Sequence, residues 1–195
     1  MGKKRSARKL HGNQCSAHLF GTGCLPNLRI AHAAPDGPKL VASGGGEKKV
    51  RLWDVQTGEC VKVIETTFEL KSACFSRSPD GRQLATGSST NFDGIEPSLA
   101  QVGDVETGAH RANLPHDDWV VSVCFTRDGT QLASGGRDDE VRVWDADTGE
   151  CVKKFSCDEH CEMRRKYWNP DVTVCFAPDG SQVQCTDKLV RRFRL

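Results

Sequence analysis

The chain has 195 residues, of which 37% are hydrophobic and 27% charged, and its 27 Lys and Arg nearly balance its 26 Asp and Glu. This composition indicates one folded domain with at most a modest extension, and it excludes a disordered chain or a membrane span. Ten Cys are too few for a disulfide scaffold of this length. With no recognisable signal peptide, we expect an intracellular protein of the cytosol or nucleus.

The first segment, residues 1–12, is expected to be a basic and disordered tail. Its cations are Lys3, Lys4, Arg5, Arg8 and Lys9. Two interpretations stay open for this tail. It is either a solvated terminus without further role, or an arm that contacts RNA or directs the chain to the nucleus.

The remainder, residues 13–195, is predicted to consist of repeated units. Asp-Gly pairs begin at Asp36, Asp80, Asp128 and Asp179, at spacings of 44, 48 and 51 residues. Further markers follow them in a constant order: an apolar stretch ending in Ser or Thr, an alternating strand ending in Trp-Asp or Gly-Asp, and a Thr-Gly turn. These markers are Ser43, Trp53, Asp54, Thr86, Asp104 and Asp145. The expected unit bounds are 13–65, 66–115, 116–156 and 157–195.

Each unit contains short apolar runs separated by Asp-Gly or Thr-Gly, which supply the positive φ that tight turns between strands need. Units of this length with about four strands predict an all-β, β-propeller-like array of about four four-stranded antiparallel blades. A ring of seven such blades would need about 280–300 residues, so we expect a short or incomplete ring. The fourth unit reaches only its third strand, and we expect Ala17–Phe20 to pair with it or with an adjacent blade.

On these repeated markers the sequence resembles the WD-repeat β-propeller family, most closely in the third unit. The resemblance implies a buried hydrogen-bonded tetrad formed by His116, Ser134, Asp138 and Trp144. The same Ser, His and Asp could be misread as a hydrolase triad. Because Ser134 lies within a repeating strand and not on a strained elbow, we expect a structural role.

The other units depart from this pattern. The second has Gly103 where the third has Trp, and the last has Phe193 at that position. The resemblance also implies that Trp119 and Arg137 face the rim used for partners, and both residue types dominate interface energies. The alternative for Trp119 is a lid over its own blade.

Cysteines that recur once per unit are expected to be small core side chains, a blade apart and too distant for disulfides. Cys157, His160 and Cys161 do not follow the repeat and offer three ligands of the kind that bind zinc. Since this spacing lacks a paired Cys-x-x-Cys, they are weak candidates, and we expect neither a metal nor a cofactor.

For function, we expect a non-catalytic scaffold that mediates protein–protein interactions within a larger complex. One alternative is an RNA- or ribosome-associated factor that uses the basic tail. A ubiquitin-ligase substrate receptor is disfavoured, because Gln56, Glu106 and Asp147 stand where such receptors carry Arg. We also expect self-association or completion by another chain, since an open array leaves exposed strand edges.

Overall fold

The computed structural model describes residues 28–33, 39–44, 48–54, 57–66, 69–76, 82–89, 98–157, 172–177, 179–186 and 190–195, with 28–33, 39–44, 186 and 190 described by their backbone alone. The basic tail and Ala17–Phe20 lie outside these residues. All the regular elements described are strands. The described part of the chain therefore holds no helix long and apolar enough to cross a membrane.

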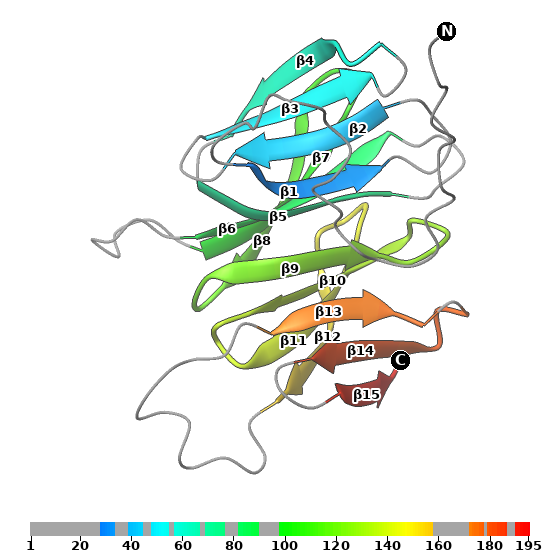
Figure 1. Ribbon diagram of the computed structural model, residues 1–195. Coiled ribbons are helices and arrows are strands. Elements are labelled where there is room, and N and C mark those ends of the chain that lie inside the picture. Colours follow the sequence, from blue (N-terminus) through cyan, green and yellow to red (C-terminus); the bar gives the residue numbers. More distant parts are fainter. Residues whose placement is uncertain are drawn as a thin grey trace, which may run out of the picture.

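Four antiparallel sheets follow one another along the chain, and each is built from consecutive strands (Figure 1). The first sheet contains β1 (Leu28–Ala33), β2 (Lys39–Gly44), β3 (Lys49–Asp54) and β4 (Cys60–Glu65). The second contains β5 (Glu69–Phe75), β6 (Gln83–Ser89), β7 (Ser98–Asp104) and β8 (His110–His116). The third contains β9 (Val120–Phe125), β10 (Gln131–Gly136), β11 (Glu140–Asp145) and β12 (Cys151–Ser156). The fourth contains β13 (Thr173–Phe176), β14 (Gln182–Thr186) and β15 (Val190–Arg194).

This architecture confirms the predicted all-β array of blades. Within the described residues the fourth sheet has three strands, while each of the other three has four. The domain and unit bounds given above stay predictions.

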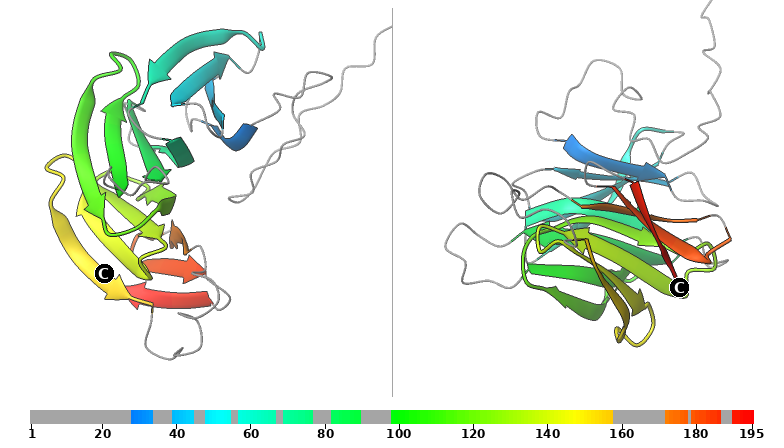
Figure 2. Two further views of the ribbon diagram at one scale, coloured as in Figure 1. Left: turned by 90° about the vertical axis from the view of Figure 1, so that its left-hand side faces the viewer. Right: turned by 90° about the horizontal axis from the view of Figure 1, so that it is seen from below.

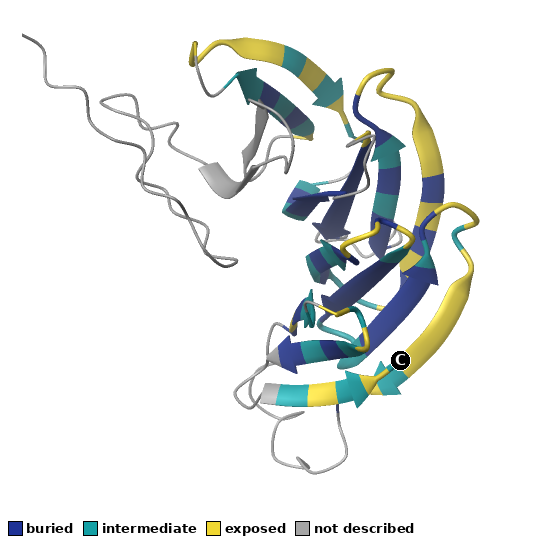
Figure 3. Cartoon of the chain, turned by 90° about the vertical axis from the view of Figure 1, so that its right-hand side faces the viewer, coloured by how far each residue is buried: buried dark blue, intermediate teal, exposed yellow. Residues whose placement is uncertain are grey.

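The sheets are arranged around an open arc, as in an incomplete propeller (Figure 2). The first strand of each sheet lies on the concave side, where β5 contacts both β1 and β9, and β9 contacts β13. The last strands, β4, β8 and β12, lie on the convex side and carry most of the exposed positions (Figure 3). Each strand order therefore runs from the inside of the arc to the outside.

Apolar clusters fill the three interfaces between neighbouring sheets, so the middle strands are covered on both faces. Every residue of β6 is buried, for example. The cluster between the second and third sheets contains Leu114, Phe125, Leu132 and Trp144. Comparable clusters join the first sheet to the second and the third sheet to the fourth. Among the described residues, the glycines of the two Asp-Gly pairs at 128 and 179 and of the three Thr-Gly turns have φ of 72–77°, as predicted.

The cysteine expectation was correct for some positions and wrong for others. Cys74 is buried, and Cys124 and Cys175 are half-buried. Burial raises the pKa of the Cys175 thiol, with further contributions from neighbouring cysteines. Cys60 and Cys151, in contrast, are exposed. They begin the outer strands β4 and β12, whose side chains face solvent on the convex side.

Candidate functional site

A chain of hydrogen bonds runs from the core of the third sheet to the loops at one of its ends. The Trp144 indole N–H donates to Ser134 Oγ over 2.7 Å. Ser134 Oγ lies 2.7 Å from His116 Nε2, and His116 Nδ1 lies 2.8 Å from Asp138 Oδ2. With the imidazole proton on Nδ1, the Ser134 hydroxyl donates to Nε2 and every donor in the chain has an acceptor. The four residues that the family resemblance implied thus lie in one connected series of hydrogen bonds.

The strand register places these side chains. Leu132 pairs with Trp144 and Ser134 pairs with Arg142 across β10 and β11, so Ser134 and Trp144 are diagonal neighbours on one face. His116 ends β8 in the second sheet. The hydrogen bond from His116 to Ser134 therefore crosses between the second and third sheets and holds them together.

A catalytic triad has the same Ser–His–Asp order, but the environment of Ser134 differs from that of a nucleophile. The residue is 0% exposed, and its Oγ already accepts the Trp144 N–H. It also lies inside β10, where the chain makes no sharp turn. Because a substrate cannot reach this hydroxyl, the arrangement is suited to stabilising the fold and not to attacking a bond.

Arg142 connects Asp138, the last residue of this series of hydrogen bonds, to the surface. Its side chain is 9% exposed, and its guanidinium lies 3.3 Å from the Asp138 carboxylate and 2.6 Å from that of Glu140. It also contacts the Asp117 carboxylate and donates to the Pro115 carbonyl. One buried cation thus links the loop after β8 to the turn between β10 and β11.

The pKa values reflect this pairing. Burial of the Asp138 carboxyl acts to raise its pKa, but His116 and Arg142 act more strongly in the other direction and hold it below its usual range. Burial of Arg142 acts to lower its pKa, but its carboxylate neighbours raise it above the usual value. Asp138 is therefore ionised at neutral pH and is a fixed negative charge beside the imidazole.

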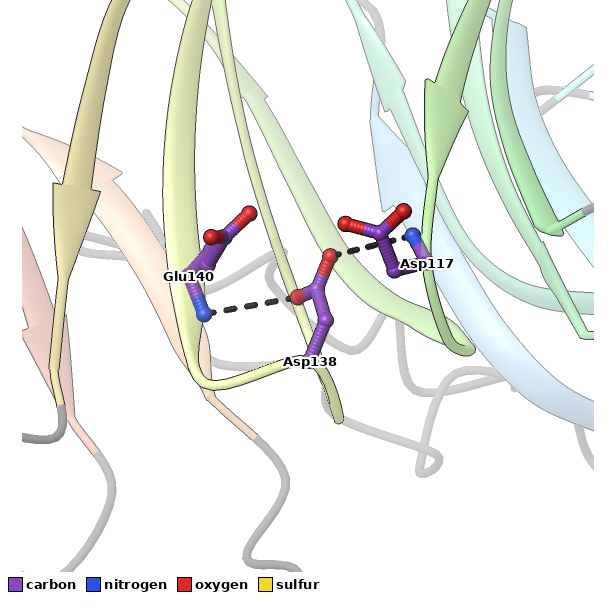
Figure 4. Close-up of side chains that lie close together, drawn as sticks. All are labelled: Asp117, Asp138 and Glu140. Atoms are coloured by element: carbon purple, nitrogen blue, oxygen red, sulfur yellow. Dashed lines mark hydrogen bonds between the residues drawn. The ribbon is translucent and has the colours of Figure 1, made fainter.

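Three carboxylates, those of Asp117, Asp138 and Glu140, lie close enough to share a metal ion (Figure 4). Asp138 also accepts the backbone N–H groups of Asp117 and Glu140, each over 3.4 Å. The guanidinium of Arg142 already lies among these carboxylates and contacts all three. Lys154 adds a contact of 2.7 Å to Glu140. The cluster is therefore balanced by protein cations and acts to fasten the loops.

Trp119 and Arg137 lie side by side on the two fastened loops. The Arg137 guanidinium carbon is 4.0 Å from the centre of the Trp119 ring, and Lys71 Nζ is 5.0 Å from it. The Arg137 N–H donates to the Trp119 carbonyl over 2.9 Å. The approach is so close that a Cβ atom at Gly136 would lie 2.3 Å from that carbonyl oxygen. Both side chains are half-buried, and this backbone hydrogen bond joins the loops that carry them.

The Asp residues that follow the Trp position hold the next turn. Asp145 Oδ1 accepts the backbone N–H groups of Asp147 and Thr148 and the Thr148 hydroxyl, at 2.8–3.0 Å. Asp104 repeats this arrangement, and the backbone N–H of Thr107 is the main cause of a pKa lowered to about 2. Asp54 likewise accepts an N–H from its turn. Sequence reasoning had marked these positions without assigning this role, which the Thr-Gly three residues later could have indicated.

Of the Ser and Thr markers in the other sheets, Thr86 has the register position of Ser134 and Ser43 does not. Thr86 pairs with Gln101, the same relation that Ser134 has to Arg142 in the third sheet. Ser43 instead pairs with Val50, one position away, because the stretch before it has an extra residue. Trp53 pairs with Leu40 and is half-buried.

Cys157, one of three weak zinc candidates, lies in the core between the third and fourth sheets. Its Sγ is 3.4 Å from the Sγ of Cys185, and both thiols are buried. His160 and Cys161 lie outside the described residues.

Comparison with known proteins identifies the repeat. Residues 109–145 match the family model described as "WD domain, G-beta repeat". This match spans β8 of the second sheet and β9 to β11 of the third. The sequence repeat is therefore offset from the sheets by one strand, and it includes the contact between His116 and Ser134.

Several curated proteins are similar over most of the chain. Protein LST8 homolog of Drosophila melanogaster is 23% identical over 137 residues, covering 61% of this chain and 37% of that protein. GID complex subunit 7 of Schizosaccharomyces pombe is 27% identical over 155 residues, covering 74% of this chain and 29% of that protein. Eukaryotic translation initiation factor 3 subunit I of Aspergillus terreus is 30% identical over 128 residues, covering 62% of this chain and 37% of that protein. The chain spans about a third of the length of these relatives. The chain is therefore similar to WD-repeat proteins, with one matched repeat at 109–145 set within consecutive antiparallel sheets.

Proposed function

We propose that the chain is a non-catalytic WD-repeat scaffold that binds protein partners within a larger complex, in the cytosol or nucleus. The observation that carries this proposal is the pair formed by Trp119 and Arg137. The two residues stack on each other. Their loops are fastened to the sheets by the buried hydrogen bonds from Trp144 to Asp138 and by the contacts of Arg142. A rigid sheet that presents such a pair is suited to recognition.

The chemistry of the pair favours a protein partner. Trp and Arg are the residues most enriched at the energetic centres of protein interfaces. Because Trp119 and Arg137 already contact each other, little conformational entropy is lost when a partner covers them. Lys71 lies against the Trp119 ring and Asp117 is on the same loop as Trp119, and these charged side chains can form part of the polar rim of an interface.

The relatives add support through their names. Two of them are named as subunits of complexes, the GID complex and eukaryotic translation initiation factor 3. Membership of a complex is the property we propose for this chain as well. Its partners are for experiment to identify.

The experiment compares three purified full-length baits in affinity capture followed by mass spectrometry. Wild-type protein is compared with Trp119→Ala and with Val152→Ala, which alters a 50% exposed side chain on β12. We expect wild type and Val152→Ala to retain the same proteins and Trp119→Ala to lose them. If all three baits capture the same set, the proposed surface is wrong.

The RNA alternative rests on the basic residues at positions 3–9 and is tested separately. A chain lacking residues 1–9 is compared with wild type for binding to a labelled single-stranded RNA at low and high salt. Loss of salt-sensitive binding on deletion supports the alternative. Equal behaviour of the two chains contradicts it.

A further inference from the structure

A cavity of about 300 Å³ lies between the first and second sheets. Val50 and Ile64 line it from the first sheet, and Leu84, Thr86 and Gly103 line it from the second. Its lining also includes exposed side chains, so the cavity is open to the surface. Pockets that bind small molecules have volumes of about 300–1,000 Å³.

The register shows why the cavity exists. Gly103 pairs with Leu84 in the second sheet as Trp144 pairs with Leu132 in the third. The cavity therefore lies where the second sheet lacks the indole that the third sheet has. Glycine at this position leaves the space open.

The turn after this position also packs less closely against the preceding sheet in the second sheet than in the third. A Cβ atom at Gly149, after β11, would lie 3.0 Å from the Cβ of Ala112 in the preceding sheet. At the equivalent Gly108, the nearest such atom is Lys62 Cε, 4.0 Å away. The first and second sheets are therefore packed less closely here than the second and third.

The lining has the chemistry of an indole site. Thr86 takes the register position of Ser134, whose Oγ accepts the Trp144 N–H. Among the described residues, no hydrogen bond engages the Thr86 hydroxyl. Val50, Ile64 and Leu84 supply apolar walls for a flat ring.

Other polar side chains of the lining already have partners. Asn113 Oδ1 accepts the Gln101 amide N–H over 2.9 Å and lies 2.8 Å from His110 Nε2. Asp104 and Glu65 place carboxyl groups beside the cavity, and the low pKa of Asp104 keeps that group negative. These carboxylates disfavour an anionic ligand, and each already has a cation of its own, Arg111 for Asp104 and Lys49 for Glu65. A neutral ring with one N–H is therefore the better match.

We propose that this cavity binds the indole of a tryptophan side chain that a partner protein presents, with the indole N–H donated to the Thr86 hydroxyl. The inference rests on the proposed scaffold function, because the occupant belongs to a protein partner. It uses a site separate from Trp119 and Arg137, so each surface can be tested alone.

The test uses purified wild-type protein titrated with indole, benzothiophene and N-acetyl-tryptophanamide, followed by protein-observed NMR. Benzothiophene has nearly the shape of indole but lacks the N–H. We expect saturable binding of indole about three- to tenfold tighter than that of benzothiophene, the size of one hydrogen bond. We also expect N-acetyl-tryptophanamide to bind, because the site accepts a side chain attached to a backbone.

Two variants and one control locate the site. Thr86→Val should retain binding but remove the preference for indole, and Gly103→Trp should abolish binding because its own indole fills the cavity. Trp119→Ala should bind indole like wild type, which separates this proposal from the first. No saturable binding to wild type, or a preference that persists in Thr86→Val, overturns the inference. Binding of indole without N-acetyl-tryptophanamide also overturns it, since the occupant is then no side chain.

Discussion

Two neighbouring interfaces in this protein share the same strand register but differ at the position of one large side chain, Trp144. Between the second and third sheets, Trp144 is buried and hydrogen-bonded, and its ring completes the apolar cluster. Between the first and second sheets, Gly103 takes the equivalent position beside a cavity of about 300 Å³. Strand pairing therefore does not depend on the tryptophan, whereas close contact between sheets does.

The second and third sheets also differ in a polar side chain at an equivalent position. In the third sheet, Arg142 connects three carboxylates and fastens the loops that bear Trp119. In the second sheet, Gln101 takes that register position and bonds to Asn113 on the adjacent strand β8. The third sheet thus uses the charged residue at this position to fix loops, while the second uses a neutral amide there, in the wall of its cavity.

The largest effect is expected when the third sheet is made to resemble the second. Trp144→Gly removes the ring and leaves a cavity, and we expect a loss of about 4–5 kcal/mol in the free energy of unfolding. Urea denaturation measures it, with Val152→Ala as a control that should change little. A loss below about 1 kcal/mol would show that the ring does not join the sheets.

Asp138→Asn should come next, with a loss of about 3 kcal/mol, because Arg142 and His116 then lack their buried charged partner. The effect should depend on pH. The pKa of Asp138 is lowered in the folded protein, so its contribution is present above the unfolded pKa of about 3.9 and is lost as pH falls through the lower folded value. Wild type should therefore lose more stability than Asp138→Asn below about pH 4. Parallel acid limbs in the two unfolding profiles would contradict this.

Ser134→Ala should cost about 2 kcal/mol, because the buried Trp144 N–H and one nitrogen of His116 lose their partner. Thermal unfolding measures the loss. Ser134→Thr is the matched control, since Thr is the natural residue at the equivalent position 86. It should retain most of the stability, and equal destabilisation by both substitutions would mean that the hydroxyl has no role.

The smallest effect is expected when the second sheet is made to resemble the third. Gly103→Trp should fill the cavity and raise the free energy of unfolding by about 1 kcal/mol. The backbone permits it, because a Cβ at Gly103 has no neighbour closer than the Ala109 carbonyl oxygen at 3.4 Å. A destabilised Gly103→Trp with a native spectrum would show that the cavity does not match an indole.

Much of the fold could be predicted because its signals are local. Asp-Gly and Thr-Gly pairs determine turns through the φ angle of a single residue, and Gly129 and Gly149 have φ of 77° and 74°. Strand periodicity likewise depends on neighbouring residues only. The Ser, His, Asp and Trp of the third unit were recognisable because they recur with the family pattern.

Other features could not be predicted from local pattern. Cys60 and Cys151 looked like core residues because they recur with the repeat, but the outer strands β4 and β12 expose them. Cys157 resembled a metal ligand beside His160, yet its thiol lies against Cys185, 28 residues along the chain. In both cases the outcome depends on which sheet face meets a neighbour.

By itself, the sequence determined the repeated strands, their turns and the all-β blade array, since these follow from backbone preferences within a few residues. Only the tertiary structure decided that Arg142 balances three carboxylates, that Trp119 stacks with Arg137, and that Gly103 leaves a cavity. Each of these contacts joins residues from different strands or different sheets. Their geometry is set by how the sheets pack, which no short stretch of sequence contains.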